Sequence, residues 1–166
     1  MSAITEDLDD VDRRIVDLLR ADGRLSNKDL ADAVGIAAST CVARTKALRD
    51  RGVLAGFTAI VPPESVGLGI ESVIQVTIRP GARQRIREFH EDMAALTEVR
   101  QIFFLAGVDD FILHVVVTDT AALRDFVVEH LSEHTAVAST RTSLVFQHED
   151  KLTAPLFRTS EGSRRS

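Results

Sequence analysis

Residues 26–52 read SNKDLADAVGIAASTCVARTKALRDRG, and this stretch decides the fold of the N-terminal part of the chain. It contains two short segments with apolar residues at helical spacing. Ser26 can cap the first, with Asp29 three residues later in the capping-box position. The second is predicted to run from about Ser39 to Arg51. The short connection 35–38 is typical of the turn that joins the two helices of a helix-turn-helix.

A third amphipathic helix is expected on the N-terminal side, over residues 9–22. Asp9 can cap it, and Gly23 follows its last turn. The inward-facing residues expected for the three helices are Val11, Ile15, Leu18 and Leu19, then Leu30, Ala31 and Val34, then Val42, Thr45 and Leu48. On the C-terminal side, residues 53–61 are rich in β-forming residues and are predicted to form a two-stranded wing. Residues 1–61 therefore read as a winged helix-turn-helix domain of three helices plus a β-wing.

A linker at 62–69 contains proline and glycine. In the rest of the chain, segments whose apolar residues have the spacing of a strand alternate with segments that have the spacing of a helix. Strands are predicted at 70–79, 99–105, 111–117 and 137–146, with helices at 82–95 and after Asp119 or Thr120. The order βαββαβ indicates a ferredoxin-like domain over 70–152. The whole fold class is therefore α+β. Residues 153–166 are expected to be a polar, flexible tail.

A four-stranded sheet with both helices on one face leaves its other face uncovered. Since that face carries apolar residues here, we expect a partner, and a homodimer is the simplest one. His114 lies in an apolar strand, and it is expected to be a core or interface residue rather than a metal ligand.

Composition narrows the class of protein. The net charge is −5, so bulk charge does not mark a nucleic-acid binder, although basic residues cluster locally between Arg44 and Arg51. The single cysteine, Cys41, excludes an internal disulfide framework, fits a reducing cytoplasm and is expected to be a small buried residue.

The acidic start MSAITEDLDD does not read as a signal peptide. The apolar runs are too short to span a bilayer, so no membrane partner is expected.

Three runs of sequence resemble the Lrp/AsnC family of bacterial and archaeal transcriptional regulators. They are LDDVDRRIVDLLRADGRLSNKDLADAVGIAASTCVARTKALRDRGVLAGF at 8–57, LAGVDDFILHVVVTD at 105–119 and TRTSLVF at 140–146. The resemblance extends over about 8–152. It implies a winged helix-turn-helix, a ferredoxin-like effector domain, small effectors of the amino-acid type, and dimers that assemble further, to an octamer. No cofactor is expected.

The chain departs from the family where the DNA-reading helix begins. The family usually has a serine cap followed by proline, whereas Ala37 and Ala38 stand here. We therefore expect this helix to begin later, with Ser39 as a substitute cap. The residues expected to contact double-stranded DNA are Ser26, Asn27, Ser39, Thr40, Arg44, Lys46 and Arg49. The alternative for each is a solvated helix face or an ordinary helix cap.

The loop between the two middle strands is the expected effector site. Glycine permits close approach of a ligand to the backbone, and a carboxylate can pair with an α-ammonium group. From spacing alone the better interpretation of this loop is an ordinary aspartate-rich turn, and it is the resemblance that favours the effector interpretation. The expected residues are Gly107, Asp109 and Asp110, with Thr142 and Leu144 from the last strand.

Two other functions remain open on sequence grounds. His130, Glu133 and His134 match H-x-x-E-H, the pattern of a zinc-dependent hydrolase. The other interpretation of this motif is the exposed end of an amphipathic helix, and it is preferred, so no metal ligand and no catalytic residue is assigned. In a third interpretation the chain is an assembly module whose N-terminal domain binds protein instead of DNA.

Overall fold

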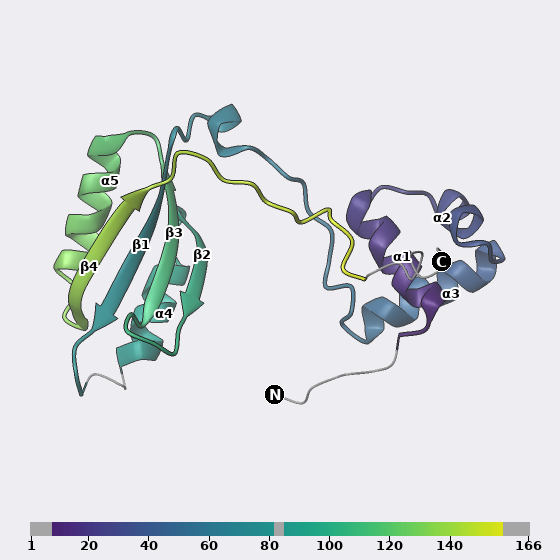
Figure 1. The fold of residues 1–166 in the computed structure, drawn as a ribbon, viewed down its shortest axis with the longest axis horizontal. Helices are drawn as coiled ribbons and strands as arrows, with labels where there is room; N and C mark the ends of the chain where they lie inside the picture. The colour runs from purple at the N-terminus through teal and green to yellow at the C-terminus, as the bar shows by residue number, and fades with distance from the viewer. Residues whose placement is uncertain (1–7, 82–84, 158–166) are drawn as a thin grey trace, which may run out of the picture. The chain divides into compact units, whose positions relative to one another are not determined.

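The computed structural model describes residues 8–81 and 85–157. These residues form two compact units (Figure 1). The head unit combines the described residues of 1–59 with those of 149–166, and the sheet unit comprises 60–148. Each unit is considered by itself below. No helix among the described residues is long and apolar enough to cross a membrane.

The head unit contains three helices, α1 (Asp10–Ala21), α2 (Asn27–Val34) and α3 (Ala38–Asp50). Both expected caps are present, because the Asp9 carboxylate accepts the Asp12 N–H at 2.8 Å and the Ser26 hydroxyl accepts the Asp29 N–H at 3.1 Å. Gly35 ends α2 at a φ of 82°, a left-handed conformation that suits glycine at a helix end. These local signals explain why three short helices form here.

One apolar core holds the three helices together. Its buried residues are Ile15, Val16, Leu19, Leu30, Ala31, Val34, Cys41 and Leu48. Cys41 is buried as expected. The prediction that Val42 faces inward was wrong, since its side chain is 45% exposed. The buried stripe of α3 runs through Cys41, Thr45 and Leu48, and Val42 lies about 100° around the helix from Cys41.

The start of α3 also differs from the prediction. The helix begins at Ala38, with Ala37 in the capping position and no side-chain cap, so Ser39 is not the cap. Gly35 N–H and Ile36 N–H both donate to the Ala31 carbonyl, which closes the C-terminal end of α2 before the chain enters α3.

Residues 53–61, predicted as a β-wing, form no strand. Tertiary contacts override the local β preference of this segment. Phe57 lies against Gly23, where an added Cβ would come within 2.7 Å of the ring, and the Arg49 guanidinium lies 5.2 Å from the centre of the same ring. The segment is thus an irregular connection anchored by one aromatic side chain.

The described part of the tail packs on the head unit. Phe157 joins the edge of the head core, the Leu156 N–H donates to the Asp17 carboxylate at 2.8 Å, and the Arg20 side chain donates to the Ala154 carbonyl at 3.2 Å. Within the predicted polar tail, residues 153–157 thus place an aromatic side chain and backbone groups against α1. The remainder, 158–166, lies outside the described residues.

The sheet unit has the predicted ferredoxin-like order. After a short 3-10 turn at Pro63–Val66, its elements are β1 (Ile70–Ile78), α4 (Arg85–Ala94), β2 (Val99–Phe104), β3 (Phe111–Val117), α5 (Thr120–Phe126) and β4 (Val137–Leu144). The antiparallel sheet has the strand order β2-β3-β1-β4. A π-helical segment, Val127–Ser132, extends α5. Residues 82–84 of the predicted first helix lie outside the described residues.

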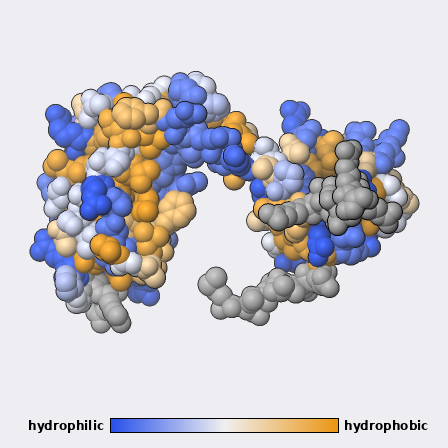
Figure 2. All heavy atoms as spheres, in the orientation of Figure 1, coloured by the Kyte–Doolittle hydropathy of each residue, from blue (hydrophilic) through white to orange (hydrophobic). Residues whose placement is uncertain are grey.

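The two helices cover one face of this sheet (Figure 1). Phe89 and Met93 from α4 and Phe126 from α5 share a core with alternate residues of β1 and β3, among them Ile74 and Leu113. The residues between these point to the uncovered face, which therefore carries Glu71, Val73, Ile112, His114 and Phe103. Figure 2 shows hydrophobic residues gathered over the strands of this unit.

Candidate functional site

The exposed face of α3 is the candidate surface for DNA. Ser39, Ala43 and Lys46 follow one another at i, i+4 and i+7, and all three are exposed. Thr40 and Ala47 flank this stripe and are exposed as well. Small residues beside hydroxyl groups and one lysine allow a helix to approach a groove closely while offering donors to phosphates and base edges.

Arg44 has partners within the head unit. Its guanidinium lies 2.6 Å from the Asp9 carboxylate and 2.8 Å from that of Asp12, both at the start of α1. The pKa of Arg44 is raised, first by the hydrogen bond to Asp9 and then by that to Asp12. The pKa of Asp9 is lowered, first by the Asp12 N–H and then by Arg44. The sequence predicts only a DNA contact for Arg44, and no local spacing reveals this ion-pair cluster, because its partners lie more than 30 residues away.

The other two basic residues of α3 are more exposed. The Lys46 ammonium group pairs with Asp50 at 2.5 Å, but both side chains are well exposed, and such pairs contribute little to stability. Arg49 is exposed and lies over the Phe57 ring. A phosphate group competes readily for an exposed lysine, so Lys46 is the basic residue of α3 best placed to leave its partner.

The start of α2 carries the two remaining DNA candidates. The Ser26 hydroxyl donates to the Asp29 carboxylate at 2.6 Å while it accepts the Asp29 N–H, so its hydrogen bonds are used within the helix cap. Asn27 is exposed at the first position of the helix. Its amide group is therefore the more accessible donor of the two.

Asp109 and Asp110 in the loop between β2 and β3 both bond to β1. The Asp110 carboxylate accepts the Ile78 N–H at 2.7 Å, and the Asp110 N–H donates to the Val76 carbonyl at 3.0 Å. The Asp109 carboxylate accepts from the Gln75 amide at 3.1 Å. Both aspartates are half-buried, whereas Gly107 is exposed with open space around it.

Thr142 and Leu144 do not join this loop on the same face of the sheet. Thr142 pairs with Ile74 and Leu144 with Ser72, and directly paired residues point to one side. Ile74 points to the helix-covered face, whereas Gln75, which holds Asp109, points to the other. Within one chain, the five expected effector residues therefore do not form one pocket.

The H-x-x-E-H motif lies at the end of the π-helical segment. His134 uses both ring nitrogens, since Nδ1 accepts the Ala136 N–H at 3.2 Å and Nε2 lies 3.3 Å from the Asp92 carboxylate. The His130 ring packs beside Phe126, with ring centres 5.2 Å apart. Within 8–81 and 85–157, these residues do not bring three ligand atoms together as a metal site would.

Comparison with known proteins gives the same two-part organisation. Residues 8–49 match the model of the AsnC-type helix-turn-helix domain, and residues 71–154 match the model of the Lrp/AsnC ligand binding domain. The first match covers nearly all of the three head helices, and the second covers nearly all of the four strands of the sheet.

Three known proteins illustrate the similarity. The transcriptional regulator AldR of Mycobacterium tuberculosis is 49% identical, over 86% of this chain and 79% of that protein. The leucine-responsive regulatory protein of Escherichia coli is 30% identical, over 86% of this chain and 87% of its own length. A solved transcriptional regulator of Neisseria meningitidis in complex with L-Met is 34% identical and superposes with a TM-score of 0.81, over 86% of this chain and 92% of that one.

A helix-turn-helix head with an exposed polar stripe and a ferredoxin-like sheet unit thus occur in the order that both family models require. The chain belongs to the Lrp/AsnC family of DNA-binding transcriptional regulators.

Proposed function

We propose that the exposed face of α3 enters the major groove of DNA, with Ser39, Thr40 and Lys46 as its principal contacts. The observation that carries this proposal is the exposed stripe of small, hydroxyl and basic residues opposite the buried Cys41–Leu48 side. Asn27 and Arg49 flank the stripe and serve as phosphate contacts. Arg44 and Ser26 act mainly by holding the helices in place, because their polar groups already have partners.

A homodimer would present two such helices to one duplex. The uncovered sheet face carries Val73, Phe103 and Ile112, and apolar side chains on an open sheet favour pairing with a second copy. Two recognition helices held by a two-fold axis read half-sites about one helical turn apart. We propose that such dimers assemble further, to an octamer, and that the protein acts in the cytoplasm.

Lys46→Ala tests the DNA interface directly. The probe is a duplex selected from a random-sequence pool by the wild-type protein. Losing one phosphate contact should lower the affinity and reduce the slope of log K against log salt by about 0.9. Ser39→Ala should lower the affinity with no change of slope, since no charge is lost. Fluorescence anisotropy at several salt concentrations measures both quantities.

Arg124→Ala is the matched control. Arg124 is an exposed basic residue on α5, and its carboxylate partner is the adjacent Asp125. Its removal should leave affinity and salt slope unchanged. If Lys46→Ala and Arg124→Ala bind the duplex with the same affinity as the wild type, α3 is not the reading helix. A wild-type protein that binds no duplex in dilute salt would favour the interpretation that the head binds protein.

We further propose that a free amino acid is the effector and that it binds at the loop 107–110. The relative solved with L-Met supports this class of ligand. Since Thr142 and Leu144 lie on the other face from Asp109, an effector touching all of these residues needs two chains. The His130, Glu133 and His134 motif has no catalytic part in this proposal.

A thermal-shift screen against the twenty amino acids tests the effector. A ligand that binds only the folded state raises the unfolding temperature. At a ligand concentration of a hundred times the dissociation constant, the free energy of unfolding increases by about 2.7 kcal/mol. Asp110→Asn tests the charge of Asp110 without removing its structural hydrogen bond, because an amide oxygen can still accept the Ile78 N–H. It should abolish the shift and retain the fold. A flat response of the wild type to all twenty would contradict an amino-acid effector.

A further inference from the structure

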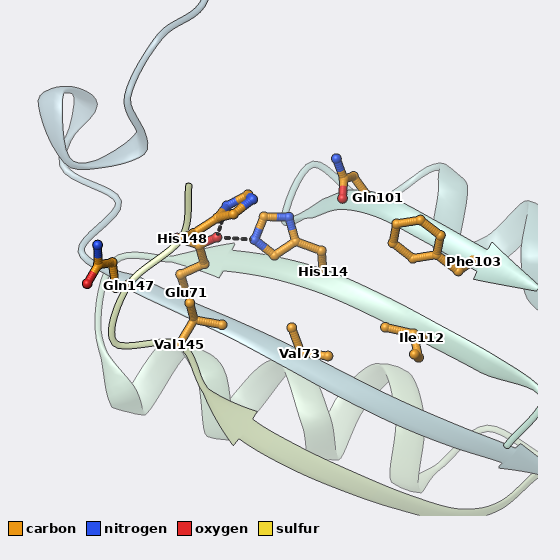
Figure 3. Close-up of a pocket in the computed structure, with 9 residues that line it drawn as sticks. All are labelled: Glu71, Val73, Gln101, Phe103, Ile112, His114, Val145, Gln147 and His148. Atoms are coloured by element: carbon orange, nitrogen blue, oxygen red, sulfur yellow. Dashed lines mark hydrogen bonds and ion pairs between the residues drawn. The ribbon is translucent and has the colours of Figure 1, made fainter. Parts of the chain in front are cut away.

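Three side chains with metal-binding atoms meet on the uncovered face of the sheet. Glu71 comes from β1, His114 from β3, and His148 from the segment that follows β4 (Figure 3). They line one end of a hollow of about 170 Å³. The wall of the hollow also includes Val73, Phe103, Ile112 and Val145. The site is separate from the α3 face and from the loop 107–110, and it lies on the sheet face proposed above to pair with a second copy.

Strand register explains why these residues converge. Glu71 pairs with Val116, and Val73 pairs with His114, so Glu71 and His114 are diagonal neighbours on one face. The Val145 N–H donates to the Glu71 carbonyl at 2.9 Å, which continues the pairing beyond β4 and leads His148 back over Glu71. Backbone pairing therefore sets the positions of Glu71 and His114, and the bond at Val145 brings the segment that carries His148 back toward them.

Both imidazoles approach the same carboxylate oxygen. Glu71 Oε1 lies 2.5 Å from His114 Nε2 and 2.8 Å from His148 Nδ1. The three ligand atoms all lie within 4.8 Å of one another. An ion bound at about 2.0–2.1 Å in tetrahedral geometry holds its ligand atoms about 3.3 Å apart. Small side-chain rotations would suffice to admit an ion between these groups.

Two of the three side chains are largely withdrawn from water. The His114 side chain is only 12% exposed and that of Glu71 22%, while apolar residues form much of the surrounding wall. Charged groups in such surroundings are paired with one another or coordinate a metal ion. Nitrogen donors select zinc and neighbouring transition metals over magnesium or calcium. Within 8–81 and 85–157 this is the one group of three such residues.

We propose that Glu71, His114 and His148 bind a divalent transition metal ion of the zinc type. Three protein ligands leave a fourth position for water or another donor. Because His148 is the last residue of the sheet unit, the ion fixes the segment after β4 to β1 and β3. This site goes beyond the regulatory function proposed above and depends on neither DNA nor an amino acid.

Zinc binding by the metal-stripped full-length protein tests the site. Competition with a chromophoric chelator should give one ion per chain for the wild type. His148→Ala removes a ligand whose side chain is 41% exposed, so the fold should be retained. Its zinc affinity should fall at least tenfold, since even an outer partner of a ligand is worth about 10–100-fold. Glu71→Gln should weaken binding in the same way.

His90→Ala is the matched control, because His90 is an exposed histidine on α4, away from this cluster. It should bind zinc as the wild type does. Zinc should also raise the unfolding temperature of the wild type and of His90→Ala, but not of His148→Ala.

Two results would overturn the proposal. One is a wild-type chain that takes up no zinc, and the other is unchanged affinity in His148→Ala. Zinc lost in His134→Ala but kept in His148→Ala would assign the ion to the H-x-x-E-H motif instead. All measurements are made without DNA and without amino acids, so their failure leaves the regulatory function untouched.

Discussion

Arg44 shows how one residue can support a binding surface without being its main contact. It joins α3 to the start of α1 through Asp9 and Asp12, and the Asp12 side chain is only 12% exposed. Arg51 lies farther from Asp12, at 3.9 Å. A basic residue so engaged stabilises the orientation of α3, and its charge is largely neutralised before DNA arrives.

Arg44→Ala should therefore destabilise the head. The variant leaves the Asp12 carboxylate without its nearest cation, so the free energy of unfolding should fall. The loss should be smaller than that of Leu48→Ala, which removes a fully buried side chain and should cost about 2–5 kcal/mol. Urea unfolding of both variants measures the difference.

A double-mutant cycle isolates the ion pair. Asp12→Asn with Arg44→Ala should be less destabilising than the sum of the single changes, because the second change removes nothing further from the pair. Strict additivity would show that Arg44 and Asp12 do not stabilise each other, and the view of Arg44 as a positioning residue would then be wrong.

At the scale of elements, side-chain caps mark the start of α1, α2 and α5, and an aspartate cap is sensitive to acid. The Asp119 carboxylate caps α5 by accepting the N–H groups of Ala121 at 2.8 Å and Ala122 at 2.9 Å. Its pKa is lowered from the ordinary value of 3.8, first by the Ala122 N–H and then by the Thr118 hydroxyl. The ionised form is thus the one that the folded state favours.

The cap should be lost in acid. A carboxyl whose folded-state pKa is lowered contributes stability above its unfolded value of 3.8, and this stability disappears as pH falls through the folded pKa. Asp119→Asn keeps a capping oxygen but cannot titrate, so its unfolding temperature should fall less steeply than that of the wild type below about pH 4. Thermal unfolding of both proteins at a series of acidic pH values measures this difference. Parallel curves would show that Asp119 contributes nothing to acid lability.

At the scale of the whole molecule, a segment late in the sequence belongs to the same unit as the three N-terminal helices. The segment 149–157 follows the last strand and belongs to the head unit, where Phe157 packs at the edge of the core. The Arg13 guanidinium lies 5.9 Å from the centre of the Phe157 ring. The head is therefore completed by residues distant in sequence from its three helices.

Phe157→Ala should loosen the head and spare the sheet. Removing a half-buried aromatic ring should cost about 1–2 kcal/mol, roughly half the value for a fully buried one. Hydrogen exchange should become faster in α1 and remain unchanged in β1 and β3. Leu156→Ala is the control, because its side chain is 60% exposed and should affect neither unit. Equal protection of α1 in Phe157→Ala and the wild type would mean that the tail adds no stability.

The order of the helices and of the four sheet strands, together with the family, follows from the sequence alone. The Asp9 and Ser26 caps, the glycine at 35 and the valine-rich apolar run 111–117 are local signals, and each acts through residues within a few positions of it. The βαββαβ order follows from them, as does the face of α3 that carries Ser39 and Lys46. The resemblance to the family then follows from short runs of residues.

Contacts between distant side chains became visible only in the folded structure. The partners of Arg44, the irregular path of 53–61, the docking of Phe157 and the meeting of Glu71 with two histidines all join segments far apart in sequence. Likewise, Thr142 and Asp109 are divided between two faces by strand register. The reason is physical: periodicity specifies which face of an element is apolar, whereas register and packing between elements fix which atoms lie within a few ångströms.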